Sequence, residues 1–178
     1  GNTAVAVFGI ICNVSIVIMS LCKGVNQAAQ PMISTNFGAG KGERIHQVFW
    51  SAVWTSLVIC AVPVVEGIVF PDLYTYIFLN PDSQILALSA SAIRIYFVGF
   101  IAMAVNMVFI SYFQAVVKPV ESLIICMLRG CVLLIALVYL LPLSLGVIGI
   151  WLAFPAAEVL TMLMGIGMFR RQKTRKAI

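Results

Sequence analysis

The chain has 178 residues, of which 62% are hydrophobic and 10% charged, and its mean hydropathy is +1.09. These values exclude a soluble globular domain. The formal net charge is +5, but the basic residues gather in short inter-helix segments and a C-terminal tail, a pattern typical of membrane topology rather than of binding to nucleic acid.

Five long apolar segments make up almost all of the sequence. An α-helix needs about 20 apolar residues to cross a hydrocarbon core of about 30 Å. Because lipid offers no hydrogen-bond partners to the backbone, such segments must be helices. We therefore expect an all-α membrane protein, a bundle of five transmembrane helices over residues 1–169, embedded in the lipid bilayer, with spans at about 3–36, 46–70, 84–117, 119–141 and 146–169.

Prolines and turn residues punctuate these spans. The first span is predicted to be one long helix bent at Pro31, and Pro63 lies inside the second. The stretch Asn80-Pro81-Asp82-Ser83 supplies turn residues and N-caps for the third span. Lys118-Pro119 forms a tight turn into the fourth span, so the third and fourth form a helical hairpin. Pro155 interrupts the fifth.

The basic residues indicate the orientation. If the spans cross in alternation, Lys41, Arg44, Lys118 and the tail at 170–178 lie on one side, and the loops on the other side contain no Lys or Arg. Basic loops mark the cytoplasmic face. We expect a multi-pass protein of the inner (plasma) membrane with a cytoplasmic, basic C-terminal tail. The chain opens on Gly1 without a start Met or a charged leader, and we expect a fragment.

Two charged residues are predicted to lie deep in the bilayer. Glu158 is about 18 Å from Arg170 by the helical rise, and Arg129 is about 16 Å from Lys118 on the same face. Since a charge at this depth is costly, the two matched depths predict an intramembrane ion pair. A role of the same residues in handling a substrate or an ion is the alternative.

Other polar residues within the spans are candidates for a cavity or for bonds between helices. Lys23 is expected to snorkel or to face the bundle interior, at a depth that depends on how the first helix is placed. Helix-to-helix hydrogen bonding is the commoner use of neutral polar side chains. The residues we select as candidates for a substrate cavity are Gln30, Asn36, Asn106 and Gln114.

Signatures of catalysis and of metal binding do not occur in the sequence. The stretch Gly38-Ala39-Gly40-Lys41-Gly42 lacks the spacing of a nucleotide-binding loop, because Thr35 and Gly42 stand where a Gly and a hydroxyl are needed. The five cysteines are odd in number, form no Cys-x-x-Cys pair, and are expected to pack in the apolar spans. His46 has no partner at ligand spacing. We expect no enzyme, no metal and no cofactor.

Three stretches together resemble the multidrug and toxic compound extrusion (MATE) family. Residues 30–41, Gln-Pro-Met-Ile-Ser-Thr-Asn-Phe-Gly-Ala-Gly-Lys, are similar to its inside-loop signature. Residues 113–119 followed by Arg129 look like its penultimate hairpin. Residues 141–158, with Gly146-Val147-Ile148-Gly149 and Pro155-Ala156-Ala157-Glu158, resemble its last helix. The order and spacing of the matches extend over nearly the whole chain.

The resemblance implies a C-terminal lobe. Family members have twelve helices in two lobes that rock between inward-open and outward-open states, and the five spans correspond to helices eight to twelve. The implied activity is export of cationic or amphipathic small-molecule drugs in exchange for H⁺ or Na⁺ by alternating access, together with the missing N-terminal lobe. Some members carry an Asp in the tenth helix, where this sequence has Asn106 and Gln114.

Two other functions agree with the same sequence. A flippase for lipid-linked precursors shares the lobe architecture, and a long lateral groove with basic residues would favour it. A non-transporting membrane scaffold or enzyme subunit would have no hydrated cavity.

Overall fold

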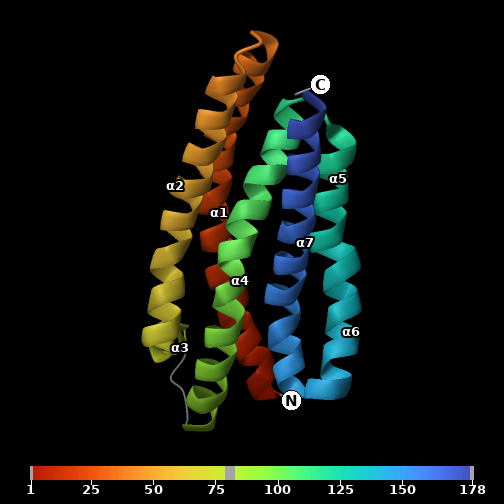
Figure 1. The fold of residues 1–178 in the computed structure, drawn as a ribbon. Coiled ribbons are helices and arrows are strands. Elements are labelled where there is room, and N and C mark those ends of the chain that lie inside the picture. Colours follow the sequence, from red (N-terminus) through yellow and green to blue (C-terminus); the bar gives the residue numbers. More distant parts are fainter. Residues whose placement is uncertain (1, 79–82, 177–178) are drawn as a thin grey trace.

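The computed structural model describes residues 2–78 and 83–176, and in this part of the chain all regular structure is helical (Figure 1). The turn expected at 80–82 lies outside these residues. The elements are α1 (Asn2–Gly38), α2 (Gly42–Val69), α3 (Pro71–Phe78), α4 (Ser83–Ala115), α5 (Pro119–Met127), the π-helix η1 (Leu128–Val132), α6 (Leu133–Leu145) and α7 (Val147–Lys176).

Five helical spans are long and apolar enough to cross a membrane, which confirms the predicted fold class. The elements α5, η1 and α6 form one of these spans, Pro119–Leu145. Two features differ from the expectation. The loop after α2 contains the additional short helix α3, and α7 continues to Lys176, so the basic stretch expected as a tail is helical as far as it is described.

The central helix of the bundle is α4, which packs against α1, α2, α5 and α7. In the most apolar part of each span, 61% of the residues of α4 are buried, against 6% for the span Pro119–Leu145. The exposed apolar surface of that outer span suits contact with lipid. Two buried clusters hold the bundle together, one around Phe97 and Phe100 and the other around Phe49 and Phe113.

The tight connections are made by residues with a positive φ. Gly40 (φ 68°) closes the turn between α1 and α2, and Gly146 (φ 58°) the turn between α6 and α7. Both conformations suit a residue without Cβ. Between α4 and α5 the same role falls to Val117 (φ 57°), a branched residue in a region it rarely adopts.

The described ends of the chain lie at opposite ends of the bundle, as five crossings require (Figure 1). One end carries the turns at Lys41 and Lys118 and the basic residues Arg170 and Arg171 of α7. We call it the basic end. The other, here called the opposite end, carries α3 and the turn at Gly146.

Candidate functional site

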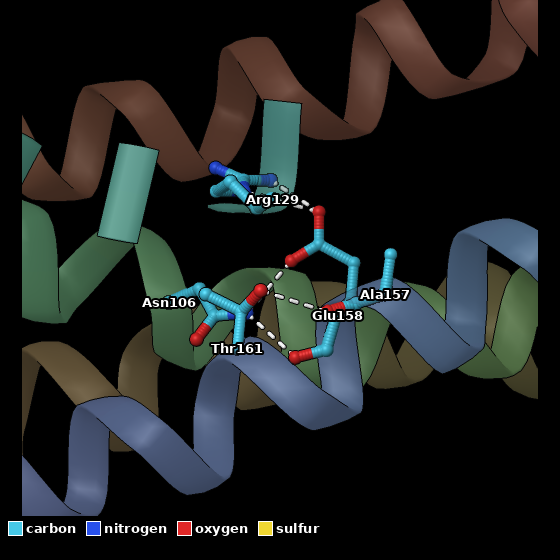
Figure 2. Close-up of polar contacts among 5 residues, drawn as sticks. All are labelled: Asn106, Arg129, Ala157, Glu158 and Thr161. Carbon is cyan, nitrogen blue, oxygen red and sulfur yellow. Dashed lines mark hydrogen bonds and ion pairs between the residues drawn. The ribbon is translucent and has the colours of Figure 1, made fainter. Parts of the chain in front are cut away.

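Three polar residues from three helical spans meet inside the membrane-spanning part of the bundle (Figure 2). Asn106 belongs to α4, Arg129 to η1 and Glu158 to α7. Measured by the helical rise from Lys118 or Arg170, each lies about 16 to 18 Å from the basic end. The three side chains therefore share one depth near the middle of the bilayer.

The two helical spans that carry the charges are irregular near them. Arg129 lies in a π-helical turn, where one extra residue per turn widens the helix and changes the direction of the side chain. Pro155 lies three residues before Glu158 and leaves the carbonyl of Trp151 without its usual helical donor. Such interruptions recur at functional positions of helices.

Glu158 is the centre of the network. Arg129 donates from Nε and Nη2 to Oε1 of Glu158, at 3.0 and 2.7 Å. Asn106 donates from Nδ2 to Oε2 of Glu158 at 2.7 Å and to its backbone carbonyl at 2.8 Å. Figure 2 shows the carboxylate between the guanidinium and the amide, with Thr161 on the same helix beside it. Each carboxylate oxygen thus has a charged or polar donor.

The network is almost completely removed from solvent. The Glu158 side chain is 3% exposed and the Arg129 side chain 14%. A buried ion pair is tolerated when its members also hydrogen-bond, whereas loss of one partner leaves an uncompensated charge. Oδ1 of Asn106 is buried and has no partner within the described residues. The arrangement ties α4, η1 and α7 together, and Glu158 is a carboxyl group that could take up a proton.

The other predicted site residues lie nearer the basic end. Gln30 of α1 donates from Nε2 to Oε1 of Gln114 of α4, at 3.4 Å. Asn36 donates only to the carbonyl of Met32 in its own helix, at 2.7 Å. The structure therefore brings together two groups, Gln30 with Gln114 and Asn106 with the ion pair, and leaves Asn36 apart from both.

A second polar cluster lies at the opposite end. Tyr74 of α3 donates to Oε2 of Glu66 at 3.0 Å, and Arg94 donates from Nε to the carbonyl of Ile68 at 3.1 Å. Burial raises the pKa of the Tyr74 hydroxyl above its ordinary value, and the hydrogen bond to Glu66 and its charge raise it further. These contacts fasten α3 and α4 to the end of α2.

Two cavities open between α2, α4 and α7 near the basic end. One has a volume of about 610 Å³, and the other, lined mostly by apolar side chains, has about 450 Å³. They share His46, Phe49 and Phe169. His46 accepts a hydrogen bond from Nε1 of Trp50 at 3.0 Å. None of the four predicted cavity residues lines either of them.

Two contacts of the site were not predicted from the sequence. The bond from Asn106 to Glu158 could have been found by depth, because Asn106 is twelve residues from Lys118 and so lies level with the ion pair. The thiol groups of Cys22 and Cys60 touch at 3.3 Å between α1 and α2. No sequence signal indicated that contact, since the two residues are 38 positions apart.

Comparison with known proteins identifies a family. The family model described as MatE matches residues 1–140. The search of curated proteins found no match. Among solved structures, an outward-facing multidrug resistance MATE family transporter of the MOP superfamily is similar with a TM-score of 0.88 and 20% identity, over 98% of this chain and 40% of that chain.

Two further structures are similar to the same extent. A MATE in complex with MaL6 has a TM-score of 0.88 at 19% identity, with 98% of this chain and 40% of that chain covered. A MOP superfamily transporter from Pyrococcus furiosus, described as having a binding pocket of reverse polarity that suggests a different function, has a TM-score of 0.87 at 20% identity, with 97% and 39% covered. The chain thus spans about 40% of the length of the transporters it matches.

Proposed function

Because this chain belongs to the MatE family, we propose that it forms one lobe of an inner-membrane transporter that exports cationic or amphipathic drugs in exchange for H⁺ or Na⁺. The fold of a multi-pass membrane transporter supports this activity. Transporters of this kind place their substrates near the bilayer midplane, at the interface between repeats. The other half of that interface would come from the N-terminal lobe.

The observation that carries the proposal is the network around Glu158. In alternating access, each lobe moves largely as a rigid body. Arg129 and Asn106 join Glu158 from two other spans of the bundle at mid-depth, and such a contact holds α4, η1 and α7 together as one unit. We assign the pair to this structural role, with proton exchange at Glu158 as the candidate step for coupling.

We assign Gln30, Asn36 and Gln114 to the substrate cavity. Gln114 is exposed, and Gln30 and Asn36 are half-buried, so their amide groups are accessible from outside the bundle. Amide groups can donate to and accept from varied drugs. Asn106 was selected with them, but its side chain is fully buried, and we place it in the network around Glu158.

Accumulation of ethidium in cells tests the proposal. The full-length parent, expressed in cells deprived of their own exporters, should lower intracellular ethidium relative to cells with an empty vector. A protonophore should abolish this effect if H⁺ is the coupling ion, and replacement of Na⁺ should abolish it if Na⁺ is. Unchanged ethidium in cells that contain the protein would refute drug export. Restored growth of cells depleted of a lipid-precursor flippase would then favour the flippase.

A further inference from the structure

The exposed surface of α1 carries a polar stripe beside an apolar one. Lys23, Gln27, Gln30 and Ser34 recur at intervals of four, three and four residues, so they lie on one face of the helix. Lys23, Gln27 and Ser34 are exposed and Gln30 is half-buried. The neighbouring exposed stripe is apolar and suits lipid contact; it contains Val17, Leu21 and Met32. Two different environments are therefore expected along the outside of one helix.

Lys23 is at the same depth as the buried ion pair. It is seven residues from Gln30, whose amide contacts Gln114, and Gln114 is four residues from Lys118. These intervals add up to about 16 Å from the level of Lys118, equal to the depth of Arg129. The four-carbon stem of a lysine cannot carry the ammonium group from this depth to the membrane surface, so Lys23 has no solvation by snorkelling.

The described part of the chain offers no counter-charge to Lys23. Its two ion pairs join Arg129 to Glu158 and Lys118 to Glu121, and Lys23 has neither an ion pair nor a hydrogen bond within the described residues. Since Glu158 is neutralised by Arg129, the middle of the described bundle carries one surplus positive charge, on Lys23. An exposed ammonium group at this depth must face water or an anionic group, not lipid.

We propose that Lys23 and Gln27 form a subsite for the anionic group of a transported amphiphile, a carboxylate, sulfonate or phosphate. The ammonium group supplies the charge, and the Gln27 amide, one helical turn away on the same face, supplies further donors. This inference rests on the proposed transport function and extends its substrate class from cations to amphiphiles that carry a negative charge. The amide-rich stripe suits a hydrated path along which such a group can move.

Transport of two dyes of opposite charge tests the subsite. Inside-out vesicles containing the full-length parent are supplied with ethidium, a cation, or carboxyfluorescein, an anion. Lys23→Gln should lower uptake of carboxyfluorescein by about 10- to 100-fold, the effect of losing one hydrogen bond to a charged group. Uptake of ethidium should be unchanged or higher, and Lys23→Arg should restore uptake of the anion. Lys41→Gln, an exposed lysine in the α1–α2 turn, is the matched control.

The outcomes separate this inference from the proposed function. Transport of ethidium without transport of carboxyfluorescein by the unaltered protein overturns the subsite and leaves drug export intact. Equal loss of both dyes in Lys23→Gln, at normal protein level, also overturns it and assigns Lys23 to a contact with a carboxylate elsewhere in the transporter. If Lys23→Gln does not accumulate, labelling of Lys23 in the unaltered protein by an amine-reactive reagent decides. Carboxyfluorescein should slow that labelling and ethidium should not; equal labelling with both overturns the subsite.

Discussion

Gly99 of α4 lies against Pro155 of α7, where the latter helix lacks one of its hydrogen bonds. A methyl group added at Gly99 would come within 2.9 Å of the Cα of Pro155 and 2.7 Å of the Phe154 ring. The backbone cannot move aside as a flexible side chain could, so α4 and α7 can approach this closely only because residue 99 has no Cβ. The contact lies seven residues along α4 from Asn106 and three along α7 from Glu158.

Gly99→Ala should therefore destabilise the bundle. Overpacking of a close helix contact costs about 1 to 3 kcal/mol. Gly167→Ala is the matched control, because a Cβ at this position of α7 meets no atom within 4 Å. Thermal unfolding of the full-length parent in detergent measures both. A Gly99→Ala protein as stable as the control would show that the two helices can separate at no cost.

Reversal of the buried pair gives a second prediction. Arg129→Glu or Glu158→Arg alone places two like charges together at 14% and 3% exposure, and breaking such a pair costs about 3 to 5 kcal/mol. The double reversal restores attraction and should recover part of the lost stability, although Asn106 is then placed to donate to an arginine. The amount of folded protein in the membrane and its unfolding temperature measure the effect. Additive losses in the double variant would contradict a direct pairing.

The depth of the charged residues could be predicted from the sequence, but part of their environment could not. The helical rise is constant, so counting from Lys118 and Arg170 places Arg129 and Glu158 level with each other. A neutral residue such as Asn106 can bond to many partners at one depth, and only the packing of α4 against α7 selects Glu158. The π-helical turn around Arg129 has no sequence signature, because it depends on one residue more per turn.

The short helix α3 was missed for a different reason. Phe70-Pro71-Asp72 reads as a turn after a transmembrane span. The same residues also fit a helix start, since Pro is favoured at the first helical position and Asp is favoured in the first turn. The burial of Tyr74 and Thr75 against α2 and α4 makes the helix the better choice, and a contact of this kind is known only from the fold.

Val117 gives a third prediction, on the α4–α5 turn. A branched side chain at φ 57° is strained, because Cβ crowds the backbone in this conformation. Val117 is 75% exposed, so its removal forfeits little packing. Val117→Gly should stabilise the protein by about 1 kcal/mol, and Val117→Asn by less. Unfolding in detergent measures this, with Val120→Gly, in the first turn of α5, as a control that should destabilise. Loss of stability in Val117→Gly would mean that the valine makes an important contact.

The hydroxyl of Tyr74 predicts a dependence on alkaline pH. Burial and the neighbouring Glu66 raise the pKa of Tyr74 in the folded protein above the value of about 10 expected in the unfolded chain. The unfolded state therefore loses this proton first, so the contribution of Tyr74 to stability is complete below pH of about 10 and decreases above it. The unfolding temperature should fall more steeply above this pH in the unaltered protein than in Tyr74→Phe.

Tyr74→Phe also removes the hydrogen bond to Glu66, so at neutral pH it should be less stable by about 1 to 2 kcal/mol. The two effects have opposite signs, and the difference between the two proteins should shrink as the pH rises. Tyr76→Phe is the control, because the Tyr76 side chain is 61% exposed on the same short helix. A difference that stays constant with pH would mean that the Tyr74 hydroxyl titrates alike in the folded and unfolded chains. The fastening of α3 would then depend on packing alone.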